Sequence, residues 1–130
     1  GVAVVAYSPL GCGALLEHPA VAAAAAGMGC TPAQALLAWT LCRGVCVIPK
    51  SVTPKRIAEN AGEGTWAAAE TWTRILQAKA KTEGCADSGE MQGSVIEEAS
   101  ALEAARHALA LLDSLGHVET HFCWNPVVVS

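Results

Sequence analysis

Two short apolar runs with a helical pattern between them constrain the fold of this chain more than any other feature. The runs are Val2–Ala6 and Val45–Ile48; the first is rich in β-branched residues and lacks the alternation of a half-exposed strand. Such runs are typical of parallel strands covered on both faces. Because a strand, a crossover helix and a second strand form a right-handed βαβ unit in nearly all proteins, the sequence predicts a parallel sheet.

The helices between the two runs have clear boundary signals. An alanine-rich helix is expected from Pro19, with Gly27 and Gly29 stopping it. A second helix is expected from a capping box, in which Thr31 and Gln34 bond each other's backbone around a proline at the first helical position. Arg43 and Gly44 suit its carboxyl end.

The segment after the second run predicts a local anion site. Pro49 ends the strand, and a helix is expected from Pro54 to about Asn60, with Thr53 as its N-cap. A helix N-terminus attracts anions, and Lys50 and Arg56 add full charges. Loops 7–14 and 49–53 both follow strands, so they should lie on one rim. Taken alone, the segment is equally typical of a turn with two solvated cations.

Composition narrows the classes of partner. The net charge of −4 predicts no general attraction to nucleic acid or to an acidic membrane. DNA binding by two successive helices is also disfavoured, because a strand separates them. No apolar run approaches the roughly 20 residues of a membrane span, and no signal-peptide pattern is visible. We expect a cytoplasmic protein.

The six cysteines include no C-x-x-C pair and no zinc-like spacing with histidine. They are interpreted as reduced, mostly buried thiols, and no metal site is expected.

The second half of the chain has a different character. Residues 61–64 are small and are expected to be flexible, whereas 66–82 and 96–115 are expected to be helical. An acidic, glycine-containing loop is expected at 83–94, and an apolar tail follows from 117. A strand-like run directly after Gly1 suggests that the chain is truncated at its start.

Several motifs together resemble one enzyme family. They are Y-S-P-L-G at 7–11, L-L-E-H-P at 15–19, T-P-A-Q at 31–34, R-G-V at 43–45 and I-P-K-S-V-T-P-K-R-I-A-E-N at 48–60. In order and spacing they resemble the carboxyl-terminal part of the aldo-keto reductases. The resemblance implies an α/β fold, a partial (β/α)8 TIM barrel holding strands 7 and 8 with their helices, followed by a mostly helical C-terminal region. Residues 1–60 would be the barrel part, 61–100 an inserted segment, partly helical or disordered, and 101–130 the last helix and tail.

The resemblance also implies an NADP(H)-dependent oxidoreductase that reduces aldehydes and ketones to alcohols. Tyr7 would stack on the nicotinamide, and Ser8 and Leu10 would line the pyrophosphate path. The 2′-phosphate would be surrounded by Lys50, Ser51, Val52, Thr53 and Arg56, and the adenine would contact Glu59 and Asn60. Among these, Arg56 best explains a preference for NADP over NAD, because its guanidinium fork matches a phosphate.

This sequence contains no counterpart of the family's catalytic Asp, Tyr, Lys and His. Tyr7 is the only tyrosine and lies in the stacking motif, and the four histidines fall outside the catalytic motif. We therefore expect no catalytic residue and no turnover by this chain alone, the small carbonyl substrate belonging to the full-length parent. The alternative is a non-catalytic half-barrel module that binds a nucleotide or a partner, with self-association through unpaired strand edges.

Overall fold

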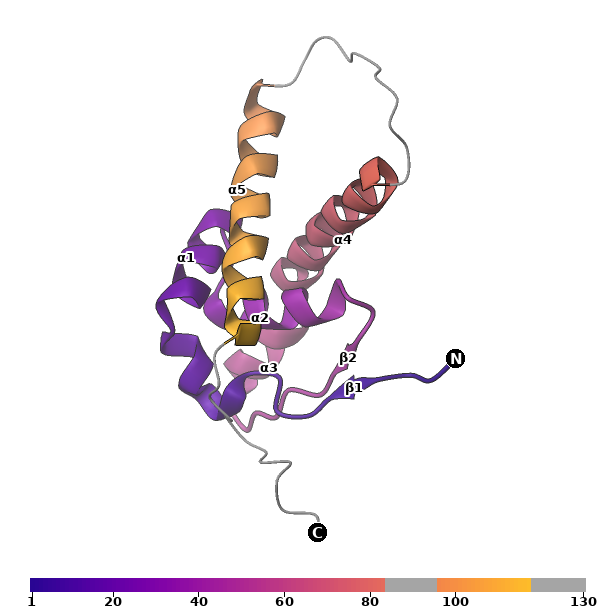
Figure 1. The fold of residues 1–130 in the computed structure, drawn as a ribbon. Helices are drawn as coiled ribbons and strands as arrows, with labels where there is room; N and C mark the ends of the chain where they lie inside the picture. Colours follow the sequence, from indigo (N-terminus) through magenta and orange to yellow (C-terminus); the bar gives the residue numbers. More distant parts are fainter. Residues whose placement is uncertain (84–95, 118–130) are drawn as a thin grey trace.

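The computed structural model describes residues 1–83 and 96–117 and shows a small parallel sheet beside a group of helices (Figure 1). In chain order the elements are β1 (Val5–Ala6), the 3-10 helix η1 (Gly11–Glu17), α1 (Pro19–Met28), α2 (Pro32–Leu41), β2 (Cys46–Val47), α3 (Pro54–Ala61), α4 (Glu63–Glu83), α5 (Ile96–Asp113) and the 3-10 helix η2 (Ser114–His117). Almost all of the predicted acidic loop and apolar tail lies outside the described residues.

The two strands pair in parallel, as the sequence predicts. Val5 lies opposite Cys46, and Ala6 lies opposite Val47. The prediction that both faces are covered is wrong for the described part of the chain, because Val5 is 51% exposed and Ile48, just after β2, is 56% exposed. The physical reason is that the helices pack mainly against one another and leave the strands at the margin (Figure 1).

The ends of α1 and α2 follow the predicted signals. Gly29 ends α1 in the left-handed region, with φ of 62°. Thr31 Oγ1 accepts the N–H of Gln34 at 3.3 Å, and Gln34 Oε1 accepts the N–H of Thr31 at 3.1 Å, which confirms the capping box. One cap was missed: His18 Nδ1 accepts the N–H of Ala20 at 3.2 Å at the start of α1. A histidine in this position satisfies an otherwise unpaired helix donor.

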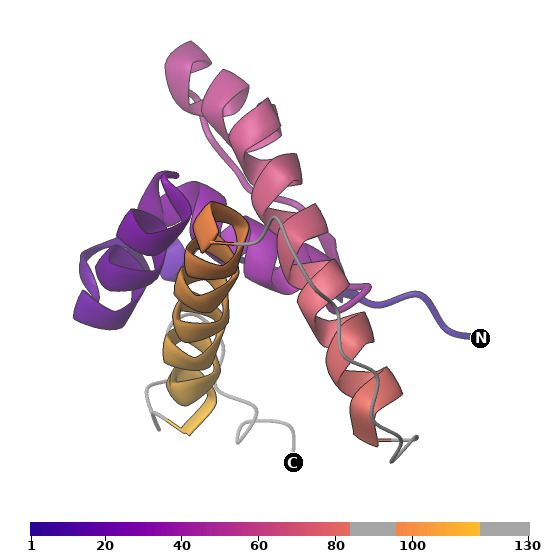
Figure 2. The same cartoon turned by 90° about the horizontal axis from the view of Figure 1, so that it is seen from above.

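The buried core lies between α1, α2, α4 and α5. α5 runs beside α1, while α4 crosses α2 at an angle (Figure 2). Alanines such as Ala24 and Ala108 are buried at these contacts and allow helices to approach closely. Trp72 is fully buried, and its indole N–H donates to the carbonyl oxygen of Ala105 at 3.0 Å, which joins α4 to α5.

The predicted flexible segment at 61–64 is largely helical. Only Gly62 separates α3 from α4, and α4 begins at Glu63 and not near Trp66. α4 contributes Ala68, Trp72 and Ile75 to the same core as α1 and α2. The proposed division into residues 1–60, 61–100 and 101–130 stays a prediction.

The cysteines differ in their surroundings. Cys42 is buried, Cys30 is half-buried and Cys46 is exposed, and all three are free thiols. Burial raises the pKa of Cys30 and of Cys42, and for Cys42 the neighbouring Arg43 opposes the effect. Cys12 takes part in a disulfide, so the prediction that all six cysteines are reduced is wrong for this residue.

None of the helices in residues 1–83 and 96–117 is both long and apolar enough to cross a membrane on its own. α1 and α2 pass that test together by length and composition, although the chain bends by 84° between them.

Candidate functional site

The loops that follow β1 and β2 line one cavity with α3. Its volume is about 880 Å³. Because the strands are parallel, their carboxyl ends meet at the same edge, and the two loops converge there. Eight of the ten residues predicted to bind cofactor line this cavity: Tyr7, Ser8, Leu10, Lys50, Ser51, Arg56, Glu59 and Asn60. Val52 and Thr53 do not line it and are exposed.

The loop after β1 is tightly turned. Ser8 has φ of 50°, its carbonyl oxygen accepts the N–H of Gly11 at 2.9 Å, and Leu10 accepts the N–H of Gly13 at 3.0 Å. Gly11 is needed here, because a Cβ at this position would lie 2.7 Å from the Leu15 side chain. The turn leaves Tyr7 75% exposed, so its ring is accessible for stacking.

The junction after β2 differs in one detail from the prediction. Thr53 occupies the N-cap position of α3 and Pro54 the first helical position, but the Thr53 side chain makes no capping hydrogen bond. The Ser51 hydroxyl instead accepts the N–H of Thr53 at 3.2 Å. This local bond shapes the loop that carries Lys50 and Ser51 beside the cavity.

Polar contacts hold α3 in place, since none of its residues is buried. The Thr31 hydroxyl donates to Oε1 of Glu59 at 2.6 Å. The Gln34 amide donates to the carbonyl oxygen of Glu59 at 3.2 Å, and the Thr65 hydroxyl donates to the same oxygen at 3.5 Å. The sequence identified Thr31 and Gln34 only as a local cap, because nothing in their spacing indicates a contact with residue 59.

Gly64 makes the Gln34 contact sterically feasible. A Cβ at this position would lie 2.8 Å from both polar atoms of the Gln34 amide. The glycine thus lets the amide fit between α3 and the first turn of α4.

The charged residues that line the cavity are Lys50, Arg56 and Glu59. Lys50 and Arg56 are exposed, and neither forms an ion pair with any of the side chains described in residues 1–78 and 102–115. Glu59 also lines the cavity, and one oxygen of its carboxylate accepts a hydrogen bond from Thr31. Two unpaired cations and one restrained carboxylate favour an anionic ligand.

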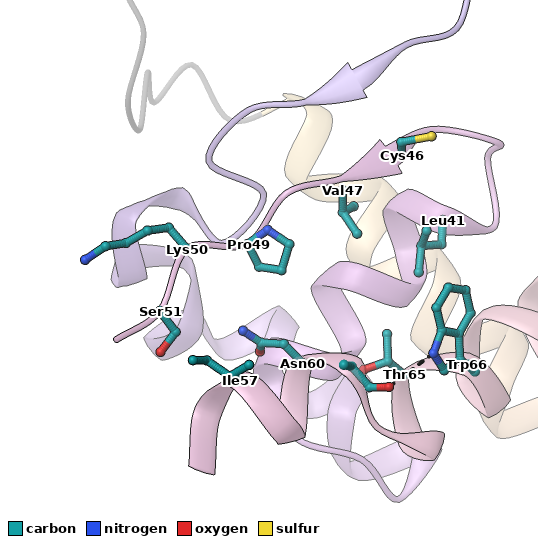
Figure 3. Close-up of a pocket in the computed structure, with 11 residues that line it drawn as sticks. Leu41, Cys46, Val47, Pro49, Lys50, Ser51, Ile57, Asn60, Thr65 and Trp66 are labelled. Atoms are coloured by element: carbon teal, nitrogen blue, oxygen red, sulfur yellow. Dashed lines mark hydrogen bonds between the residues drawn. The ribbon is translucent and has the colours of Figure 1, made fainter. Parts of the chain in front are cut away.

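A second groove of about 630 Å³ adjoins the first along Pro49, Lys50, Ser51 and Asn60 (Figure 3). Apolar side chains, among them Val47, Ile57 and Trp66, also line this groove. Lys50 extends away from Leu41 and Trp66 in this view, toward solvent. Within the part of the chain that the structure describes, no group of three or more His, Cys, Asp or Glu residues is arranged to hold a metal ion.

Comparison with known proteins identifies relatives over part of the chain. The chain is 53% identical over 60 residues to an aldo-keto reductase of Mycobacterium sp. (strain KMS) and 49% identical over 70 residues to aldo-keto reductase family 1 member A1 of Pongo abelii. Each match covers 46% of this chain and 22% of the relative. An aldo/keto reductase of Synechocystis sp. is 42% identical over 71 residues, covering 45% of this chain and 22% of the relative.

No protein-family model and no solved structure matches the chain. The matched region spans about a fifth of the length of these curated relatives. The resemblance to the aldo-keto reductases that the motifs indicate is therefore confirmed, over 46% of this chain.

Proposed function

We propose that this chain binds NADPH as part of an aldo-keto reductase, with β1 and β2 as the seventh and eighth strands of a (β/α)8 barrel. The observation that supports the proposal most is the cavity itself, because eight of the ten residues implied by the resemblance line it. Those eight come from three segments, after β1, after β2 and on α3. The similarity to aldo-keto reductases supports the same proposal.

The chemistry of the lining fits a phosphorylated dinucleotide. Arg56 offers a guanidinium fork, Lys50 a mobile ammonium group and Ser51 a hydroxyl, the donors that a dianionic phosphate requires. Tyr7 also lines the cavity and is exposed, so its ring is accessible to a nicotinamide. When bound, NADPH supplies a hydride for reduction of an aldehyde or ketone, while this chain binds and orients the cofactor.

In this family, hydride transfer to a substrate requires a catalytic Asp, Tyr, Lys and His. This sequence has no counterpart of those four residues. We therefore propose that the chain binds cofactor without reducing a carbonyl compound. Turnover of a simple aldehyde with NADPH by the purified chain would contradict this part of the proposal.

Titration with NADPH and NADH tests the binding. Tryptophan quenching or nucleotide fluorescence should show tighter binding of NADPH. Arg56→Met should weaken NADPH binding by about tenfold and NADH binding little, as expected for loss of one charge-assisted phosphate contact. Lys55→Met is the matched control, because Lys55 is the neighbouring exposed cation on α3 and does not line the cavity.

Two results would overturn the proposal. One is no measurable binding of either nucleotide by a folded chain. The other is an equal loss of NADPH affinity in Arg56→Met and Lys55→Met, which would indicate nonspecific attraction between α3 and an anion.

A second candidate is a non-catalytic module that pairs with another chain. The exposed side chains of Val5 and Ile48 favour it, as does the pairing of each strand with one neighbour in the described residues. Sedimentation analysis distinguishes the two candidates. A defined oligomer that binds NADP without turnover supports the module, whereas a monomer that binds NADPH supports the first proposal alone.

A further inference from the structure

The helix α3 carries three residues of the cavity lining, although none of its own side chains is buried. The three are Arg56, Glu59 and Asn60. Most helices in proteins are held by packing of an apolar face, and a helix as short as α3 is not stable alone. The position of α3, and with it the position of Arg56 at the cavity, therefore depends on polar contacts.

The side-chain amide of Gln34 makes one such contact from outside the cavity. Its Nε2 donates to the carbonyl oxygen of Glu59 at 3.2 Å, while its Oε1 accepts the N–H of Thr31 at 3.1 Å. Gln34 itself does not line the cavity. One amide thus completes the cap of α2 and holds the last turn of α3.

The bond from Gln34 ends on the backbone of Glu59 and not on its carboxylate. It therefore places α3 whatever contact the Glu59 side chain makes with a ligand. A second donor, the hydroxyl of the buried Thr65, lies farther from the same carbonyl oxygen, at 3.5 Å. Arg56 precedes Glu59 by about one helical turn, so a shift of this carbonyl displaces the guanidinium as well.

We propose that Gln34 is a positioning residue for NADPH, because it holds α3 where Arg56 reaches the 2′-phosphate. The inference rests on the proposed function, since it concerns the same cavity. It gives a role in cofactor binding to a residue on α2 that the sequence indicates only as part of a local cap.

Gln34→Glu separates this role from capping. A carboxylate oxygen still accepts the N–H of Thr31, and glutamate serves in capping boxes as glutamine does. An ionised carboxylate has no hydrogen to donate, so the bond to the Glu59 carbonyl is lost. Gln34→Met has a similar length, adds no charge and loses both bonds.

The test uses the intact chain, with folding checked by circular dichroism, and calorimetric titration with NADPH and NADH. Both Gln34→Glu and Gln34→Met should weaken NADPH binding by about tenfold, as expected for loss of one charge-assisted contact. NADH lacks the 2′-phosphate, so its affinity should fall by a smaller factor. A general weakening of the fold would instead lower both affinities equally.

Arg56→Met supplies the second arm. If Gln34 acts by placing Arg56, adding Gln34→Glu to Arg56→Met should weaken NADPH binding by no more than about threefold, because the contact is already lost. Repulsion between the new carboxylate and the phosphate would persist in this background and give the full loss.

Three results would overturn the inference while NADPH binding by the unsubstituted chain stays intact. One is unchanged NADPH affinity in Gln34→Glu, which would leave Gln34 as a cap alone. The others are equal losses for the two nucleotides and a full tenfold loss in the Arg56→Met background. Failure of the unsubstituted chain to bind either nucleotide would instead overturn the proposed function, and this inference with it.

Discussion

The hydroxyl of Thr31 donates to the carboxylate of Glu59 at 2.6 Å while it accepts the N–H of Gln34 at 3.3 Å. One side chain therefore caps α2 and holds α3, although Thr31 and Glu59 are 28 residues apart. Gln34 completes the link through the backbone of Glu59. The candidate site thus depends on contacts that begin outside it.

Gly64→Ala should disrupt this link. The new Cβ would lie 2.8 Å from the Gln34 amide, which must shift and strain its hydrogen bonds to Glu59 and Thr31. Because the amide is the end of a flexible side chain and alanine favours the helix, we expect a net loss of only about 1 kcal/mol in the free energy of unfolding, measured by urea denaturation.

Gly27→Ala is the control for that substitution. Its nearest non-local atom would be the Ala104 carbonyl oxygen at 3.5 Å, an ordinary contact, and alanine favours a helix by up to about 1 kcal/mol. Equal losses in the two variants would contradict a specific role for Gly64.

Trp72→Ala should destabilise the folded chain far more than Trp66→Ala. Trp72 is fully buried and donates to Ala105, whereas Trp66 is 59% exposed. We expect a loss of about 3–5 kcal/mol for Trp72 and less than about 1 kcal/mol for Trp66.

Unfolding of the unsubstituted chain, followed by circular dichroism, should show one cooperative transition, because α4 shares a core with α1 and α2. A separate transition for the helices after residue 61, with the rest unaffected by Trp72→Ala, would show that the two halves fold independently.

Asp113→Asn should have a small, salt-dependent effect. The carboxylate of Asp113 accepts from the Trp39 indole at 2.9 Å and pairs with Arg43, which also lies 4.6 Å from the Trp39 ring centroid. Asparagine can still accept from Trp39, so the difference reports on the charge. Because both charged side chains are partly exposed, we expect about 0.5–1 kcal/mol at low salt and less at high salt.

The exposed pair of Arg74 and Glu70 provides the comparison. Glu70→Gln should cost no more than about 0.5 kcal/mol. A larger loss for Glu70 than for Asp113 in thermal melts would contradict this ranking.

Deprotonation of the Cys42 thiol should contribute to a loss of stability at alkaline pH. Burial raises the pKa of this thiol in the folded chain, so the folded state retains a proton that the unfolded state releases. The stabilisation is complete below the ordinary thiol pKa of about 8.5 and is lost as pH rises through the raised value. Cys42→Ala should therefore show a shallower decline above pH 8.5 in urea titrations than the unsubstituted chain.

Alkylation tests the burial of Cys42 independently. Among the three free thiols that the structure describes, iodoacetamide should modify the exposed Cys46 first and Cys42 slowly, as followed by mass spectrometry. Rapid modification of Cys42 in the folded chain would contradict its burial.

Local sequence signals predicted the helix ends well. The capping box at Thr31, the left-handed Gly29 and Pro54 at the start of α3 each depend on atoms within four or five residues. The shared cavity was also predictable, because parallel strands bring their following loops to one edge. These features need no knowledge of distant packing.

Other features depended on contacts that the sequence does not encode locally. The alanine-rich α1 has no directional apolar face, so its partner α5 could not be identified from periodicity. The Trp72 bond to Ala105 and the Thr31 bond to Glu59 join residues far apart in sequence. The exposure of Val5 followed from the placement of the helices and not from the composition of the strand.

The buried residues of the described core lie on α1, α2, α4 and α5 or immediately beside them, and none lies on β1, β2 or α3. The helix α3, which carries three of the lining residues predicted to bind cofactor, therefore contributes no buried side chain to the core that joins the other helices. Substitutions there should accumulate with little selection against misfolding, so recognition of a ligand could diverge in evolution, or be redesigned, while the helical scaffold stays the same.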